Sequence, residues 1–361
     1  MRLLAALATA TLIVAACGSR VESGSSASPK PRASLGASAS ASGRIVAFPD
    51  LPFILGTNTG DLFFQLVNGQ AAGRKVHACQ GAIRELFAYG RRAVFLCGAG
   101  HDSTLRLYDD DSGSVTTLVQ TEATMAAFDG ADRVVFVAIG EDRSPAPIPT
   151  TKLLALDLRT GAKAELDDRF GVAFELRTTG EGVAVWRPRN SESFVRPEAE
   201  AGTWIVSGTT LSKLSAHRLI DGGKGRDLLE SEPMSAYGYA STGSTFVVWR
   251  TNDERRLTPA DVPDEKGLAL LEDGRVVTWR PQNGLFDGTV VIYDPLKGLV
   301  LRADRGMFSS FKTQRSGDWL VGLEYSGPPA LTLRAYRISD GAFASTPGGG
   351  ISAIAFLGPK K

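Results

Sequence analysis

The chain has 361 residues, of which 43% are hydrophobic and 22% are charged, and its formal net charge is +1. This composition excludes a disordered chain and provides enough apolar residues for a sizeable core. The near-zero net charge shows no electrostatic footprint for nucleic acid, so no nucleic-acid partner is expected.

Residues 1–16 have the features of a targeting segment. Arg2 supplies a positive charge, and Leu3–Ala16 is an apolar run that is too short to span a bilayer. The junction Val14-Ala15-Ala16-Cys17 resembles the lipobox of bacterial lipoproteins. That resemblance implies cleavage before Cys17, a lipid anchor on its sulfur, and a location on the extracytoplasmic side of the cell membrane. An ordinary cleaved signal peptide with an incidental cysteine is the alternative.

Residues 17–43 are predicted to be the lipidated cysteine and a linker. Gly18–Gly43 is dominated by Ser, Ala, Gly and Pro and contains no aromatic residue. Such a segment cannot bury enough apolar surface to offset the entropy of ordering it. We therefore expect a flexible tether that holds residues 44–361 near the membrane without fixing their orientation.

From Arg44 onward the sequence repeats one pattern. Ala82–Val119 contains four short apolar runs separated by Gly or by Asp/Ser/Gly clusters, and the pattern returns at Met125–Leu166 and Leu268–Ala303. Four strands in each unit of about forty residues indicate the blades of a propeller. The predicted fold is all-β, a β-propeller over residues 44–361 with seven blades, and six or eight blades remain open as alternatives.

The same pattern assigns the remaining blades. The assignments are Pro52–Val76 as three strands of blade one, Val172–Arg187 resuming at Ala216–Glu230 as blade four, Met234–Arg250 as an incomplete blade five, and Met307–Thr346 as blade seven. The final run, Gly350–Gly358, fits the vacant position in blade one. We expect the two ends of the propeller to share that blade, which removes exposed sheet edges.

One face of the predicted propeller carries the long loops. Aligning the second strands places these residues in register: Leu96, Val137, Trp186, Trp249, Trp279 and Leu323. The two longest intervals coincide with polar insertions at Glu141–Thr151 and at about residues 190–214. Loops that follow second and fourth strands emerge on one face of a propeller, and functional residues concentrate on such loops.

Three second strands end alike on that predicted face. The candidate binding residues are Trp186, Arg187, Trp249, Arg250, Trp279 and Arg280. The guanidinium is a planar fork that holds carboxylates, and both residue types are enriched in binding hot spots. The alternative is that each Trp fills space between blades while each Arg reaches water from a buried stem.

The cysteines and histidines give few candidates for chemistry. Cys79 and Cys97 lie at opposing ends of one predicted hairpin, so an exported chain is expected to join them in a disulfide. His77 and His101, with Asp102, are a weak metal alternative because no ligand spacing supports them. Asp109–Asp111 is expected to cap a tight turn. We predict no catalytic residue, no metal and no cofactor, because the motifs of nucleophile elbows, phosphate loops and zinc helices are all missing.

The segment Leu271–Gly298, LEDGRVVTWRPQNG followed by GTVVIYDPLKG, resembles the repeat of TolB-type, WD40-like bacterial propellers, although the usual Pro-Asp-Gly before the second strand is missing. The resemblance implies protein partners in the cell envelope. We expect a lipid-anchored binding or scaffolding module for a protein, peptide or glycan. An exported propeller enzyme, such as a hydrolase, lyase or quinoprotein, is the alternative. Histidines and carboxylates at the channel mouth favour the enzyme, whereas an Arg and Trp rim favours binding.

Overall fold

The computed structural model divides the chain into residues 1–37 and residues 38–361. It describes residues 41–42, 44–67, 70–98, 103–120, 123–139, 151–167, 175–187, 202–223, 225–231, 245–258, 264–282, 288–306, 313–325 and 331–358. The predicted signal peptide, Cys17 and most of the predicted tether lie outside these residues.

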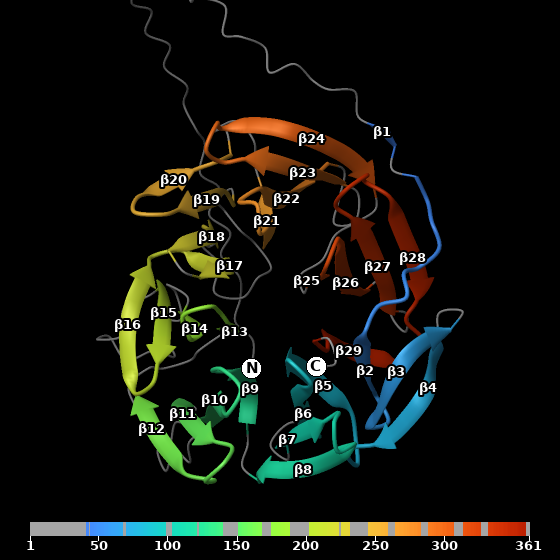
Figure 1. The fold of residues 1–361 in the computed structure, drawn as a ribbon, viewed down its shortest axis with the longest axis vertical. Coiled ribbons are helices and arrows are strands. Elements are labelled where there is room, and N and C mark those ends of the chain that lie inside the picture. Colours follow the sequence, from blue (N-terminus) through green and yellow to red (C-terminus); the bar gives the residue numbers. More distant parts are fainter. Residues whose placement is uncertain are drawn as a thin grey trace, which may run out of the picture. The chain divides into compact units, whose positions relative to one another are not determined.

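The described residues form seven antiparallel sheets of four strands each, placed around a common centre (Figure 1). One of the sheets carries a short fifth strand at its outer edge. The fold is therefore an all-β propeller with seven blades, as the repeat predicts. No described segment forms a helix long and apolar enough to cross a membrane.

In each blade the strands run from the innermost to the outermost in chain order, and in blade one β29 takes the innermost place. Blade one comprises β29 (Ile351–Phe356), β2 (Phe53–Thr57), β3 (Asp61–Val67) and β4 (Gln70–His77). Blade two comprises β5 (Ile83–Tyr89), β6 (Arg92–Cys97), β7 (Thr104–Asp109) and β8 (Ser114–Val119). Blade three comprises β9 (Ala123–Phe128), β10 (Arg133–Ile139), β11 (Thr151–Asp157) and β12 (Lys163–Asp167).

Blades four to seven follow the same order. Blade four comprises β13 (Glu175–Thr178), β14 (Val183–Arg187), β15 (Gly202–Ser207) and β16 (Thr210–Ser215). Blade five comprises β17 (Arg218–Gly223), β18 (Arg226–Glu230), β19 (Val247–Arg250) and β20 (Glu254–Arg256). Blade six comprises β21 (Lys266–Leu270), β22 (Val276–Pro281), β23 (Gly288–Asp294) and β24 (Leu299–Gly306), with β1 (Ala41–Ser42) outside β24. Blade seven comprises β25 (Thr313–Ser316), β26 (Trp319–Tyr325), β27 (Leu331–Arg337) and β28 (Phe343–Pro347).

The ring closes in blade one, as predicted from the unpartnered final run. β29 supplies the innermost strand and pairs with β2, with Phe356 opposite Phe53 and Ile354 opposite Leu55. Because the last strand of the chain hydrogen-bonds to the first strand of the blade series, the ring has no open gap between blades one and seven.

The predicted boundary between blades four and five is wrong. The segment Ala216–Glu230 supplies the first two strands of blade five and does not continue blade four. Blade four is completed by β15 and β16, which lie inside the segment that was predicted to be an insertion. The corrected second strands begin at Arg92, Arg133, Val183, Arg226, Val276 and Trp319. The pattern was misleading because β18 and β20 are only five and three residues long.

The core lies between neighbouring blades. Middle strands such as β6 and β14 are buried almost throughout, whereas outer strands such as β8 alternate between exposed and partly buried residues. This difference arises because both faces of a middle strand are covered by neighbouring blades. Between blades one and two, for example, Ile54, Ile83, Phe95 and Tyr108 pack into one apolar cluster with no exposed surface.

The connections are long on one face only. The spacing between second and third strands is widest in three blades, where residues 140–150, 188–201 and 231–246 separate the two strands. The turns that join first to second strands and third to fourth strands are short, as at residues 90–91 and 208–209. We call the face with the longer connections the loop face and the opposite one the turn face. The predicted asymmetry of the propeller is therefore present.

Candidate functional site

The three predicted Trp-Arg pairs do not share one face. Trp186-Arg187 ends β14 and Trp279-Arg280 lies near the end of β22, so both pairs lie at the loop face. Trp249-Arg250 belongs to β19, which is a third strand and runs in the opposite direction. Arg250 therefore lies at the turn face, and its predicted alignment with the other two pairs is wrong.

The side chains of these pairs are largely buried. Trp186, Trp249 and Trp279 have exposed fractions of 7%, 8% and 5%, and that of Arg187 is 2%. This burial matches the alternative in which the tryptophans fill space between blades.

The other two arginines form ion pairs inside their own blades. Arg250 Nη1 lies 3.3 Å from Asp227 Oδ2. Arg280 donates at 3.0 Å to Glu265 Oε2 and at 3.0 Å to the Tyr293 hydroxyl. Burial alone would lower the pKa of Arg280, but the Glu265 charge outweighs burial and raises it. Both arginines therefore help to hold strands of one blade together.

Charged side chains gather instead at the centre of the ring. The innermost strands of blades four, five and six begin with Glu175, Arg218 and Lys266 (Figure 1). Each of these strands starts at the loop face, where the chain arrives from the preceding blade. Glu230 lies opposite Arg218 in the register of β17 and β18. We define Glu175, Arg177, Arg218, Glu230 and Lys266 as the central charged cluster.

Hydrogen bonds connect this cluster across three blades. Arg218 of blade five donates from Nε to Glu175 Oε2 of blade four at 2.7 Å, and Glu175 also pairs with Arg177. Arg218 Nη1 lies 3.8 Å from Glu230 Oε1. The backbone N–H of Gly267 in blade six donates to Glu230 Oε2 at 3.0 Å. The cluster is therefore a network in which each acid is held by a group from a neighbouring strand or blade.

Burial and charge act differently on the two acids. Burial would raise the pKa of Glu175, but the charges of Arg177 and Arg218 outweigh it and hold the pKa below its ordinary value. Burial raises the pKa of Glu230, and the nearby Arg218 offsets only part of that effect. Burial likewise lowers the pKa of Lys266. Opposing shifts of two neighbouring acids are typical of functional sites, and structural ion-pair networks also produce them.

Two of the predicted tryptophans border the cluster. Trp186 lines a small hollow together with Glu175 and Arg177. Lys266 Nζ lies 5.9 Å from the centre of the Trp279 ring, within the range of a cation–π contact. The side chains of Arg177 and Arg218 are 29% and 31% exposed, whereas that of Glu230 is 6% exposed. Solvent therefore reaches the guanidinium groups more readily than the buried acid.

This cluster was not predicted from the sequence. Arg218 was assigned to the continuation of blade four, and Lys266 lies just before the predicted start of blade six. The available signal was a charged residue at the first position of three successive innermost strands. That signal is visible only once the boundary of blade five is correct.

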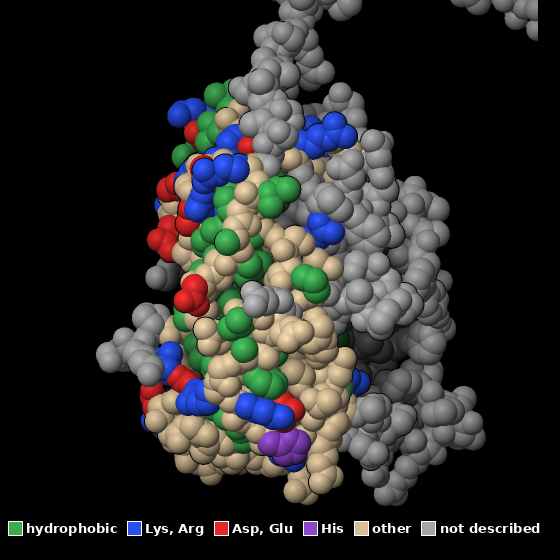
Figure 2. Space-filling view, turned by 90° about the vertical axis from the view of Figure 1, so that its right-hand side faces the viewer, with side chains coloured by type: hydrophobic (Ala, Val, Ile, Leu, Met, Phe, Trp, Pro, Cys, Tyr) green, Lys and Arg blue, Asp and Glu red, His purple; other side chains and the backbone are tan. Residues whose placement is uncertain are grey.

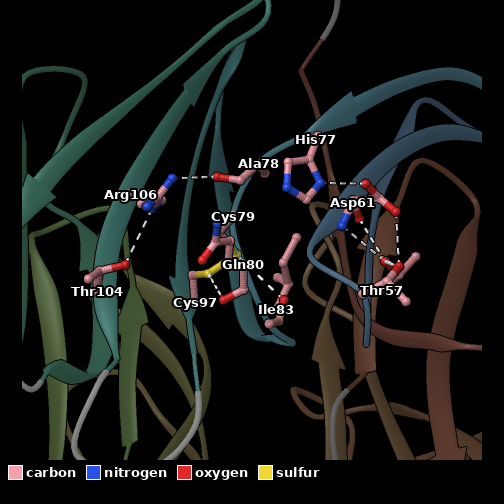
Figure 3. The surroundings of a disulfide bond; sticks show 12 residues. Thr57, Asp61, His77, Ala78, Cys79, Gln80, Ile83, Cys97, Thr104 and Arg106 are labelled. Carbon is pink, nitrogen blue, oxygen red and sulfur yellow. Dashed lines mark hydrogen bonds and ion pairs between the residues drawn. A yellow bond between two sulfur atoms is a disulfide. The ribbon is translucent and has the colours of Figure 1, made fainter.

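The predicted disulfide is present between Cys79 and Cys97, with the two Cα atoms 6.2 Å apart (Figure 3). It ties the connection that enters blade two to the end of β6. Gly60 packs closely against this region. Its φ is +80°, and a Cβ added to it would lie 2.0 Å from the Cys79 carbonyl oxygen, so only glycine fits at this position.

His77 lies near the disulfide but pairs with an acid of its own blade. His77 Nδ1 is 2.9 Å from Asp61 Oδ1, as Figure 3 shows. Burial would raise the pKa of Asp61, but hydrogen bonds from His77 and Lys75 outweigh it and lower the pKa to about 2. The weak metal alternative required His101 and Asp102, which lie outside the described residues. Within those residues no three His, Cys, Asp or Glu side chains are grouped to hold a metal ion.

Ser215, His217 and Glu254 form another polar group, at the outer part of blades four and five. Ser215 Oγ donates to one carboxylate oxygen of Glu254, and His217 Nε2 lies 3.5 Å from the other. The acid lies between the hydroxyl and the imidazole. Activation of a serine nucleophile needs the imidazole in that middle position, so this arrangement is not a catalytic triad.

No protein-family model matches the chain, and no curated protein sequence matches it. Among solved structures, it is similar to an acylaminoacyl peptidase of Pyrococcus horikoshii, with a TM-score of 0.54, 11% identity and coverage of 82% of this chain and 51% of that one. A puromycin-hydrolysing peptidase of Mycobacterium tuberculosis aligns with a TM-score of 0.51, 12% identity and coverage of 84% and 56%.

TolB from Acinetobacter baumannii also aligns, with a TM-score of 0.41, 11% identity and coverage of 81% of this chain and 66% of that one. The chain spans about half of the length of the acylaminoacyl peptidases that it matches. Similarity at 11–12% identity describes a shared propeller fold and nothing about activity.

Proposed function

We propose that this protein is a lipid-anchored binding module on the extracytoplasmic side of a cell membrane, and that the central charged cluster is its ligand site. The observation that carries the proposal is the set of charged residues from three blades that begin the innermost strands at the loop face. Binding residues are commonly placed at loop-bearing ends of rigid scaffolds. Membrane attachment is supported by the lipobox-like junction at Cys17.

The ligand that fits this cluster best carries a carboxylate. Arg177 and Arg218 are partly exposed, and both already pair with Glu175, so a ligand carboxylate would share these guanidinium groups with that acid. Trp186 and Trp279 lie beside the charges but are buried, so they pack behind the cluster and leave recognition to its charged groups. A short peptide with a free C-terminal carboxylate carries the required charge, and so does an acidic side chain of a protein partner. We take the peptide as the first ligand class to test.

The test compares short peptides with free C-terminal carboxylates with the same peptides carrying C-terminal amides. Saturation-transfer NMR with the purified protein should detect the free acids and not the amides. Arg218→Gln should weaken binding about 30-fold, because loss of a hot-spot arginine costs about 2 kcal/mol. Arg159→Gln is the matched control, because Arg159 is an exposed arginine on the turn face of blade three.

Two results would count against the ligand site. One is equal binding of acid and amide peptides. The other is an unchanged affinity in both Arg218→Gln and a second variant, Arg177→Gln. Thermal unfolding of each variant is recorded in parallel, because Arg218 also compensates the charge of the buried Glu230. If a variant unfolds at a lower temperature than the wild type, its affinity is not used. The ligand site is then judged from the binding of acid and amide peptides to the wild type.

An exported peptidase or peptidase subunit is the second candidate function. The observation that favours it is the similarity of the propeller to the peptidases of Pyrococcus horikoshii and Mycobacterium tuberculosis. The one such group described above, Ser215, His217 and Glu254, does not have the order of a triad. Hydrolysis of the same free-acid peptides by the purified protein would support this candidate, and binding without hydrolysis would support the module.

A further inference from the structure

The outer part of blade six carries a group of exposed apolar side chains. Leu296, Leu299, Val300 and Leu301 have exposed fractions of 75%, 46%, 39% and 45%. These four are the majority of the large hydrophobic side chains that are exposed among the described residues. We call them the blade-six patch. Contiguous exposed apolar residues on a soluble protein mark an interaction site.

The turn at this patch is built like its counterparts in other blades. Asp294 Oδ1 accepts hydrogen bonds from the backbone N–H groups of Leu296 and Lys297, both at 3.1 Å. Asp157 Oδ1 accepts in the same way from Arg159 and Thr160, at 2.9 and 2.8 Å. The three turns of this type end in a glycine with φ near +67°: Gly113, Gly161 and Gly298 have values of 67°, 70° and 66°.

Blade two confirms that this geometry needs no apolar residue. Asp109 Oδ1 accepts from Asp111 N and Ser112 N at 3.0 and 3.2 Å, so the predicted capping of a turn by Asp109–Asp111 is confirmed. The position of Leu296 is held by Asp111 in blade two and by Arg159 in blade three. Because the backbone and the aspartate set the turn, folding does not explain a 75% exposed leucine at its tip.

Two basic groups lie beside the patch. Lys297 lies in the turn itself, where its side chain is 70% exposed and its Nζ is 3.2 Å from Asp294 Oδ2. Arg255 is exposed, and its guanidinium would lie 2.9 Å from a Cβ added to Gly298. At the upper end of the described surface in Figure 2, the end at which β24 lies in Figure 1, hydrophobic and basic side chains are visible together with acidic ones. Exposed apolar side chains beside Lys and Arg are a composition that binds the surface of an anionic bilayer.

The first described residues of the chain lie along the strand that carries the patch. β1 runs parallel to β24, with Ala41 opposite Asp304 and Ser42 opposite Arg305. Proceeding from Ser42 back to Ala41 therefore leads along β24 toward the patch. Cys17 precedes Ala41 by 24 residues (41 − 17), a length whose flexible reach is roughly 25–30 Å. A lipid on Cys17 would thus lie within reach of this edge of the propeller.

We infer that the blade-six patch docks on the surface of an anionic phospholipid bilayer, with Leu296 inserted at the level of the headgroups. The choice of a bilayer as the partner rests on the proposed membrane attachment. The presence of the exposed patch does not depend on that proposal. The turn that carries Leu296 lies at the turn face, and the central charged cluster lies at the loop face. Docking through this turn therefore directs the ligand site away from the membrane.

The test uses residues 18–361 without a lipid, because residues 38–361 form a compact unit of their own. Co-sedimentation is measured with vesicles of phosphatidylglycerol mixed with phosphatidylcholine and with vesicles of phosphatidylcholine alone. We expect binding to the anionic vesicles, and a loss of about tenfold in partitioning for Leu296→Arg, which copies the residue of blade three. Arg159→Ala, the control in the equivalent turn, should bind as the wild type does.

A second measurement locates the contact. Leu296→Trp and Arg159→Trp are compared for quenching by brominated lipids, and only the tryptophan at position 296 should be quenched. The inference is overturned if the wild type does not bind anionic vesicles, if Leu296→Arg binds unchanged, or if both tryptophans are quenched equally. It is also overturned if sedimentation shows a dimer that Leu296→Arg dissociates, because a second copy then covers the patch.

Failure of this inference is distinguishable from failure of the proposed function. The protein used here lacks Cys17, so its vesicle binding does not depend on lipidation. Mass analysis of the N-terminal peptide of the exported protein tests the anchor separately. Peptide binding at the central charged cluster should remain unchanged in Leu296→Arg, because the two sites lie on opposite faces.

Discussion

Removing the disulfide between Cys79 and Cys97 should destabilise the propeller by about 3 kcal/mol. The bond joins residues separated by 18 positions, and the chain-entropy model gives about this value for a loop of that length. Both cysteine residues are buried, with exposed fractions of 4% and 3%. The double substitution Cys79→Ala and Cys97→Ala removes the constraint without leaving a reactive thiol. For a domain of this size, 3 kcal/mol corresponds to a fall in Tm of about 4 °C.

Urea unfolding of the oxidised wild type and of the double variant measures this difference directly. The reduced wild type is the control, and it should match the double variant to within about 1 kcal/mol. The reasoning is refuted if the double variant is as stable as the oxidised wild type. In that case the bond would not restrict the unfolded chain beyond what the hairpin of β5 and β6 already restricts.

Three further perturbations have defined outcomes. The pKa of Asp61 is lowered from 3.8 to about 2, so the stability that this acid contributes is present above pH 3.8 and is lost as the pH falls toward 2. The free energy of unfolding measured against pH should show this loss in the wild type and less of it in Asp61→Asn. Gly288→Ala should cost ~1–3 kcal/mol in urea unfolding, because the added Cβ would lie 2.3 Å from Trp279 Nε1. A cost near zero would show that Trp279 moves aside. Cys17→Ser should release the protein from membranes or block its processing, and membrane fractionation with mass analysis measures both effects. A wild-type protein that is soluble and carries no lipid would contradict this prediction.

Features that depend on local sequence were predictable. The Gly and Asp turns, the alternation of apolar residues and the repeated unit of four strands predicted the blades. The unpartnered strand at Gly350–Gly358 predicted the closure by β29. The Cys79 and Cys97 pairing followed because both residues flank one hairpin. In each case the decisive contact lies within one blade or at a chain end, so spacing along the sequence is sufficient.

Features that depend on several blades were not predictable in the same way. β18 and β20 are too short to give a periodic signal, and the segment 232–244, which contains Tyr and Ala, was interpreted as a strand in their place. That error moved Trp249-Arg250 to the wrong strand and the wrong face. The central charged cluster draws its residues from blades four, five and six, and only the ring arrangement brings them together.

The most direct test of the proposed ligand site is a chemical-shift map of peptide binding. The backbone amide of Gly267 donates to Glu230 Oε2 at 3.0 Å and therefore reports on the central charged cluster. Titration with a short peptide that has a free C-terminal carboxylate should shift the Gly267 amide resonance and leave that of Gly161, in the turn of blade three, unchanged. A bound peptide that shifts resonances elsewhere and not that of Gly267 would contradict the assignment of the ligand site.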